Sequence, residues 1–125
     1  MPDTINPEER TAAAPARPHA GPVTLVNCFV VDPARDDAFV ALWTDTSGYF
    51  RARPGFVSLR LHRALSPETH YRYINVATWE SAERFLAAHD TDEFRAVVGQ
   101  PAWSEFPSSP ALYEVVTEFA SAPPG

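Results

Sequence analysis

The chain has 125 residues, 45% of them hydrophobic and 21% charged, values that are typical of a single soluble globular domain. Its net charge of -6 and its lack of a basic stripe exclude nucleic acid as a partner. The single cysteine, Cys28, excludes an internal disulfide and a cysteine-based zinc cluster. No apolar run approaches the roughly 20 residues that cross a bilayer, and the acidic N-terminus, which has no apolar segment, leads us to expect no secretory signal. We therefore expect a cytoplasmic protein with no membrane partner.

Both ends of the chain are rich in proline and small residues. Four prolines interrupt residues 1–21, and two more occur in residues 121–125. Such segments cannot bury enough apolar surface to fold by themselves. We expect a disordered arm over 1–21, one folded domain over 22–119 and a flexible tail over 120–125.

The first half of the domain predicts a strand followed by a long helix. Residues 22–31 are apolar on both alternating faces, which indicates a strand covered on both sides. Asp32 and Pro33 form a helix start, with an acidic N-cap followed by proline at the first helical position. Apolar residues then recur at helical spacing until Pro54 and Gly55 end the helix.

The second half predicts three further strands and a second helical crossover. Strands are expected over 56–63 and 70–79, joined by a turn, and a helix follows the capping residue Ser81. A short helical segment begins near residue 92. Residues 99–110 are expected to form a long loop that carries Trp103 and Phe106, packed over this protomer's pocket or over its partner's. Residues 111–119 are expected to form the last strand.

This order, βαββαβ, predicts an α+β, ferredoxin-like fold. Right-handed crossovers place both helices on one face of a four-stranded antiparallel sheet. The other face is then uncovered, although apolar residues are expected there: Val26, Cys28, Val30, Phe56, Ile74, Val76 and Val116. A bare apolar face of this size predicts a homodimer.

Two asparagines are expected on the helix-covered face. Strict alternation places Asn27 and Asn75 there together with Leu25, Phe29, Val31, Val57, Leu59, Leu61, Tyr73, Ala77 and Trp79. Burying an amide is costly unless a hydrogen-bond partner is present. Either neighbouring backbone or a ligand in a cavity between sheet and helices could supply that partner, and the residues alone leave both readings open. For Trp79 and Trp43, the residues alone favour simple burial in the core over a ligand contact.

The candidate site residues fall into three groups. The candidate catalytic residues are Asn27, Asn75 and Trp79, and the candidate substrate-binding residues are Phe29, Trp43, Leu59, Leu61, Tyr73 and Phe85. His62 and His70 are candidate general bases, although alternation turns both away from the asparagines. No metal site is expected, because His, Asp and Glu do not recur at ligand spacing. A glycine-rich phosphate loop and a nucleophile elbow are also lacking.

The element order, Asn27 in the first strand, and the run Asn-Val-Ala-Thr-Trp-Glu-Ser at 75–81 resemble the antibiotic biosynthesis monooxygenase superfamily over about residues 23–119. The resemblance implies a dimeric α+β barrel. Within the superfamily, the chain most resembles the cofactor-independent, quinone-forming monooxygenases of aromatic polyketide pathways, whose catalytic residues correspond to Asn27, Asn75 and Trp79. Haem-degrading members need a Trp and a His where this chain has Ala88 and Val98, and that departure argues against haem.

The resemblance implies oxidation of an anthrone-type polyketide with O2 and without a cofactor. The asparagine amides and the Trp79 indole N–H would stabilise the oxyanion of the substrate. Two alternatives remain on the same fold. An aromatic polyketide cyclase would use the pocket without O2, and a non-catalytic dimeric binding protein would use its asparagines structurally.

Overall fold

The computed structural model describes residues 19–122, so most of the expected N-terminal arm and the last three residues of the chain lie outside the described part. The elements in chain order are β1 (Val23–Phe29), the 3-10 helix η1 (Pro33–Arg35), α2 (Asp36–Arg51), β2 (Phe56–Arg63), β3 (Tyr73–Trp79), α3 (Ala82–Ala88), α4 (Asp92–Val98), the 3-10 helix η2 (Pro101–Glu105) and β4 (Ser108–Tyr113).

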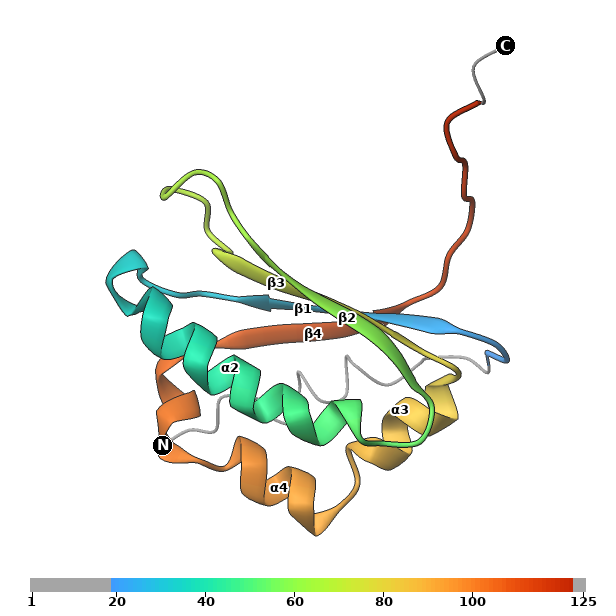
Figure 1. The fold of residues 1–125 in the computed structure, drawn as a ribbon, viewed down its shortest axis with the longest axis horizontal. Coiled ribbons are helices and arrows are strands. Elements are labelled where there is room, and N and C mark those ends of the chain that lie inside the picture. Colours follow the sequence, from blue (N-terminus) through green and yellow to red (C-terminus); the bar gives the residue numbers. More distant parts are fainter. Residues whose placement is uncertain (1–18, 123–125) are drawn as a thin grey trace.

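The four strands form one antiparallel sheet in the order β2-β3-β1-β4, and the helices α2, α3 and α4 all lie on the same face of it (Figure 1). The predicted ferredoxin-like α+β fold is therefore confirmed. The two central strands are β1 and β3, and the site described below is built mainly on them.

Local capping explains where the helices begin. The Asp32 carboxylate accepts a hydrogen bond from the backbone N–H of Ala34 at 2.8 Å, and Pro33 follows it. Ser81 caps α3 by accepting from the Arg84 N–H at 3.1 Å. Thr91 starts α4 in the same way, so the chain turns sharply between α3 and α4.

The turn between α2 and β2 depends on Gly55. Its φ of +88° lies in the left-handed region, and a Cβ there would overlap the side chain of Arg84. The Gly55 carbonyl accepts the N–H of Glu80 at 2.8 Å. This turn therefore fixes the point at which β3 passes into α3.

A β-bulge in β2 changes the predicted assignment of faces. Phe56 pairs with Trp79 and Ser58 with Thr78, so Val57 is an extra residue in the strand. Val57 is 54% exposed rather than facing the helices. Phe56, expected on the open face, instead packs against Trp79 at a ring-centroid distance of 5.5 Å. Both predictions were wrong because a bulge reverses the alternation on one side of it.

The last strand also differs from its prediction. It spans Ser108–Tyr113 rather than 111–119, and the expected 99–110 loop contains the 3-10 helix η2 and the first residues of β4. Val116, expected on the open sheet face, lies beyond β4 and is 82% exposed. The segment that follows β4 extends away from the body of the protein (Figure 1).

The buried core consists of two separate clusters on the helix side of the sheet. The first cluster contains Val23, Leu25, Ala77, Trp79, Ala82, Phe85 and Ala88. The second contains Phe29, Val31, Phe39, Tyr73, Trp103 and Phe106. Along β1, Asn27 lies between members of the two clusters, and along β3 so does Asn75. The two asparagines therefore occupy the gap in the core.

Among the described residues, the helices are too short or too polar to traverse a lipid bilayer.

Candidate active site

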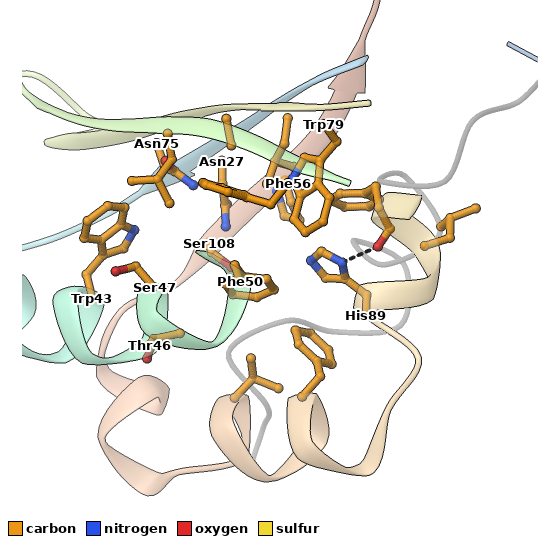
Figure 2. A pocket seen from close by; sticks show the side chains of 18 of the residues that line it. Asn27, Trp43, Thr46, Ser47, Phe50, Phe56, Asn75, Trp79, His89 and Ser108 are labelled. Carbon is orange, nitrogen blue, oxygen red and sulfur yellow. Dashed lines mark hydrogen bonds between the residues drawn. The ribbon is translucent and has the colours of Figure 1, made fainter. Parts of the chain in front are cut away.

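A cavity of about 520 Å³ occupies this gap between the sheet and the helices (Figure 2). Its volume is within the range of roughly 300–1,000 Å³ that is typical of small-molecule sites. The sheet contributes Leu25, Asn27, Phe29, Phe56, Leu59, Asn75, Ala77, Trp79, Ser108 and Pro110. The helical layer contributes Trp43, Thr46, Ser47, Phe50, Phe85, Leu86, Ala87, His89, Asp90, Phe94, Val98 and Trp103.

Asn27 and Asn75 are direct partners in the antiparallel pairing of β1 with β3. Their side chains point from the sheet into the cavity, with the amide nitrogens directed toward the helices (Figure 2). The carboxamide oxygen of each is buried and accepts no hydrogen bond within the described part of the chain. Neither side chain is therefore satisfied by the backbone of that part, which favours the ligand reading over the structural one.

Ser108 adds a third polar group to this side of the cavity. It is the first residue of β4, pairs with Phe29 and is 3% exposed. Its hydroxyl oxygen is buried without a hydrogen-bond partner among the described residues. Ser108 and the asparagines thus form a cluster of unsatisfied polar groups, in the following called the polar cluster.

Trp79 lies at the end of β3 and is 1% exposed. Its ring makes edge-to-face contacts with Phe50 at 6.4 Å, Phe56 at 5.5 Å and Phe85 at 5.8 Å between centroids. The indole N–H is buried and has no acceptor in the described part of the chain. Because this N–H is buried, a ligand can reach it only if a neighbouring side chain moves.

His89 ends α3 and lines the same cavity. Its Nδ1 lies 2.7 Å from the carbonyl oxygen of Phe85, and its ring stacks on Phe50 at 5.0 Å (Figure 2). Burial lowers the pKa of His89 to about 4, although the hydrogen bond to Phe85 acts in the opposite direction. The imidazole is therefore neutral at physiological pH.

The structure brings most of the sequence-predicted site residues to this cavity. Seven of them line it: Asn27, Asn75, Trp79, Phe29, Trp43, Leu59 and Phe85. Tyr73 is buried in the second core cluster and Leu61 packs against that cluster, so neither reaches the cavity. His62 is exposed and pairs with Ile74 on the open face, and His70 is exposed before β3 begins. Neither histidine lines the cavity.

Sequence reasoning missed several residues of the site. Phe50 belongs to the apolar residues at helical spacing in α2, and that spacing alone does not distinguish a site residue from a core residue. Ser108 was placed in a loop because the last strand was predicted to start three residues later. His89 could have been identified from the sequence. It lies on the apolar face of a helix, and a polar side chain there needs a hydrogen-bond partner, as the two asparagines do.

The charge of the cavity is low. Of the described residues that line it, Asp90 is the one with a charged side chain, and it is exposed. No group of three or more His, Cys, Asp or Glu side chains in the described part of the chain is arranged to hold a metal ion. The cavity therefore suits an uncharged aromatic molecule with a few polar groups.

Comparison with known proteins agrees with this architecture. Residues 22–100 match the family model described as antibiotic biosynthesis monooxygenase. None of the curated proteins compared with the chain matches it. A putative monooxygenase from Shewanella loihica PV-4 is 30% identical, with a TM-score of 0.69 and coverage of 81% of this chain and 100% of that one.

Two other solved structures are informative. SnoaB from Streptomyces nogalater, described as a cofactor-independent oxygenase, is 27% identical, with a TM-score of 0.68 and coverage of 82% of this chain and all of SnoaB. A variant of MhuD with bound manganese protoporphyrin IX is 24% identical over 79% of this chain and 99% of MhuD, and its TM-score of 0.64 shows a shared fold. The family match and the likeness to SnoaB support monooxygenase activity in general. The chain belongs to the antibiotic biosynthesis monooxygenase family.

Proposed function

We propose that this protein is a cofactor-independent monooxygenase that oxidises an anthrone-type aromatic polyketide to a quinone with O2. One observation carries the proposal: Asn27 and Asn75 lie side by side and direct their amide nitrogens into a neutral cavity walled by aromatic rings, while neither amide oxygen has a partner in the described part of the chain. Such a cavity binds fused aromatic rings by burial and stacking, and the amides bind a polar atom at one edge of them.

The chemistry needs no external reductant. An anthrone loses a proton from its methylene carbon, and the resulting anion is delocalised over the fused rings and its oxygen. This anion transfers electrons to O2 and forms a hydroperoxide at the same carbon. Loss of water then gives the quinone, so one oxygen atom remains in the product and the other leaves as water. The substrate itself supplies all the electrons that reduce O2.

In this mechanism the protein stabilises charge and excludes water. The amide N–H groups of Asn27 and Asn75 donate to the oxygen on which the anionic charge develops. The surrounding aromatic side chains lower the local dielectric and strengthen those hydrogen bonds. The indole N–H of Trp79 is a further donor if a neighbouring side chain moves on binding. His62 and His70 are outside the cavity, so we assign no protein base, and the methylene proton passes to water.

The lining of the cavity fits haem poorly. The Nε2 atom of His89 has the chemistry of an axial ligand. However, haem carries two anionic propionates, and among the described residues no Lys or Arg lines the cavity, while Asp90 does. An acidic rim without a cationic partner disfavours those propionates. The proposed mechanism therefore does not involve haem.

We also propose that the protein is a homodimer. Val26, Cys28, Ile74 and Val76 lie on the sheet face opposite the helices, and all are partly exposed in the single chain. Val115, Val116 and Phe119 in the extended segment after β4 are exposed as well. A second copy packed against this face would bury both sets of apolar residues.

Oxygen uptake with dithranol tests the proposed function. The purified wild type should consume O2 and form the anthraquinone faster than the reaction without protein, and a chelator should not slow it. Asn75→Ala and Trp79→Phe, checked for folding by circular dichroism, should be slower. Unchanged rates in both folded variants contradict the assigned site. Conversion of a polyketide substrate under strict anaerobiosis favours the cyclase, and tight binding without turnover favours a binding protein.

A further inference from the structure

His89 is a polar group of the cavity to which the proposed mechanism assigns no role. Its ring is held between aromatic side chains of three helices: Phe50 of α2 at 5.0 Å, Phe85 of α3 at 4.0 Å and Phe94 of α4 at 4.8 Å between centroids. A side chain that was needed only to fill this space could be apolar. The presence of an imidazole therefore calls for a chemical explanation.

The hydrogen bond to Phe85 determines which nitrogen carries the proton. The Phe85 carbonyl oxygen can only accept, so Nδ1 of the neutral His89 ring must donate across the 2.7 Å distance. Nε2 is then the unprotonated nitrogen and offers a lone pair. Within the described part of the chain it has no hydrogen-bond donor, and it is directed toward the interior of the cavity (Figure 2).

The backbone around His89 is fixed as firmly as its ring. The hydroxyl of Tyr49 donates to the carbonyl oxygen of Ala88 at 2.6 Å, and it also lies 2.6 Å from the Thr91 hydroxyl. Ala88 precedes His89 in the chain and Thr91 follows it, so Tyr49 contacts both flanks. One buried tyrosine of α2 thus ties down both flanks of the turn that carries the imidazole, and the position of Nε2 is set before a ligand arrives.

The environment makes His89 an acceptor rather than a base. With a pKa of about 4 it remains neutral near physiological pH, but it binds a proton too weakly to remove one efficiently from a carbon acid. A neutral imidazole nitrogen in an apolar site is nevertheless a good partner for an O–H group. A phenol is the O–H donor that suits an aromatic cavity of this kind.

We propose that His89 Nε2 accepts a hydrogen bond from a phenolic hydroxyl on the substrate ring farthest from Asn27 and Asn75. Phe56 lies between the asparagines and His89, and Trp79 borders His89 at 6.2 Å between ring centroids (Figure 2). A planar fused-ring molecule along this wall would have its oxygen atoms at both ends. This inference rests on the proposed function and narrows its substrate to polyketides that carry a hydroxyl at the end remote from the reacting carbonyl.

Quinone product analogues test the inference without turnover. Quenching of tryptophan fluorescence should be titrated with 2-hydroxyanthraquinone, 2-methoxyanthraquinone and anthraquinone, at a mildly acidic pH that keeps the phenol protonated. In 2-hydroxyanthraquinone the hydroxyl is too far from either carbonyl to bond internally. The wild type should bind it roughly 3- to 10-fold more tightly than the methoxy compound, as expected for one added hydrogen bond.

His89→Phe keeps a planar ring in the aromatic stack and removes the acceptor. It should bind the hydroxy and methoxy compounds equally, while His89→Gln, whose amide oxygen can accept, should keep part of the preference. The matched control, His62→Phe on the open face, should behave like the wild type. A wild type without preference overturns the inference, whether or not the variants fold. The inference is also overturned if His89→Phe lowers the affinity for both compounds by the same factor and so retains the preference for the hydroxy compound. A purely structural role of His89 predicts that result.

The same experiments distinguish failure of the proposed oxygenase activity from failure of the inference about His89. A preference for the hydroxy compound that depends on His89, combined with no oxygen uptake, would mean that His89 selects phenols in a protein that is not an oxygenase.

Discussion

Asn27 and Asn75 face each other across the pairing of β1 with β3, and both leave a buried amide oxygen unpartnered within the described chain. They lie where the hydrophobic core divides into two clusters. A leucine at either position would join those clusters and bury more apolar surface. Local rules of stability are thus broken at two adjacent positions, a pattern expected at a functional site.

Asn75→Ala should separate stability from activity. The substitution removes a buried oxygen that has no partner in the described structure, so the free energy of unfolding should be unchanged or should rise by about 1 kcal/mol. It also removes a proposed oxyanion donor, so turnover of dithranol should fall by roughly 100-fold or more. Urea unfolding and oxygen uptake on the same preparation measure the two effects.

Asn27→Ala and the double variant provide the comparison. Because the two amides are cross-strand neighbours that we assign to one oxygen atom, their effects on turnover should not add. If the fall in turnover of the double variant, expressed as an activation free energy, equals the sum of the two single-variant values, the assignment of both amides to one oxygen atom is wrong.

Ser108→Ala tests the third member of the polar cluster. Its hydroxyl is buried and unpartnered within the described residues, so removing it should not lower the melting temperature. Affinity for quinone product analogues should fall by roughly 3- to 10-fold if the hydroxyl contacts the ligand. Ser109→Ala is the matched control, because Ser109 is the exposed neighbour in the same strand. Equal affinity of both variants would remove Ser108 from the site.

The order of elements could be predicted because it depends on short-range signals. The Asp32-Pro33 start, the Ser81 cap and the Gly55 turn each have a local physical cause that is visible in the sequence. The facing of Asn27 and Asn75 followed from simple alternation, which holds in the two central strands.

Predictions failed where the edge strands depart from regular geometry. The bulge at Val57 exchanged the places of Phe56 and Val57, and no residue in β2 marks it. Ser108 was missed because residues 99–110 were predicted as a loop, whereas β4 begins at Ser108 and includes Pro110, which an edge strand tolerates. The position of His89 depends on the turn between α3 and α4 and on Tyr49, which is a long-range contact that periodicity does not reveal.

Acid should weaken the attachment of α2 to the sheet. Asp36 at the start of α2 accepts two hydrogen bonds from Arg72, at 2.8 and 2.7 Å. Arg72, the main cause, and Tyr73 lower the pKa of Asp36 from 3.8 to about 2. A lowered folded-state pKa stabilises the fold above about pH 4, and this contribution disappears as the pH falls toward 2.

The measurement is the difference in unfolding free energy between wild type and Asp36→Asn as a function of pH. This difference should be largest near neutrality and should shrink below about pH 4. Asp37→Asn is the matched control, since Asp37 is exposed on the same turn and forms no ion pair in the described structure. A difference that grows as the pH falls would contradict the assignment.

Val76→Glu should convert the proposed dimer into monomers. Val76 lies near the centre of the sheet face opposite the helices and is paired with Val26 on the neighbouring strand. A carboxylate buried there against a second copy would lack a partner and would cost several kcal/mol. Val40→Glu is the control, because Val40 is exposed on α2 in the helical layer, on the other side of the sheet. Sedimentation velocity should give a dimer for the wild type and for Val40→Glu, and a monomer for Val76→Glu. A monomeric wild type at micromolar concentration would mean that the sheet face has no partner copy.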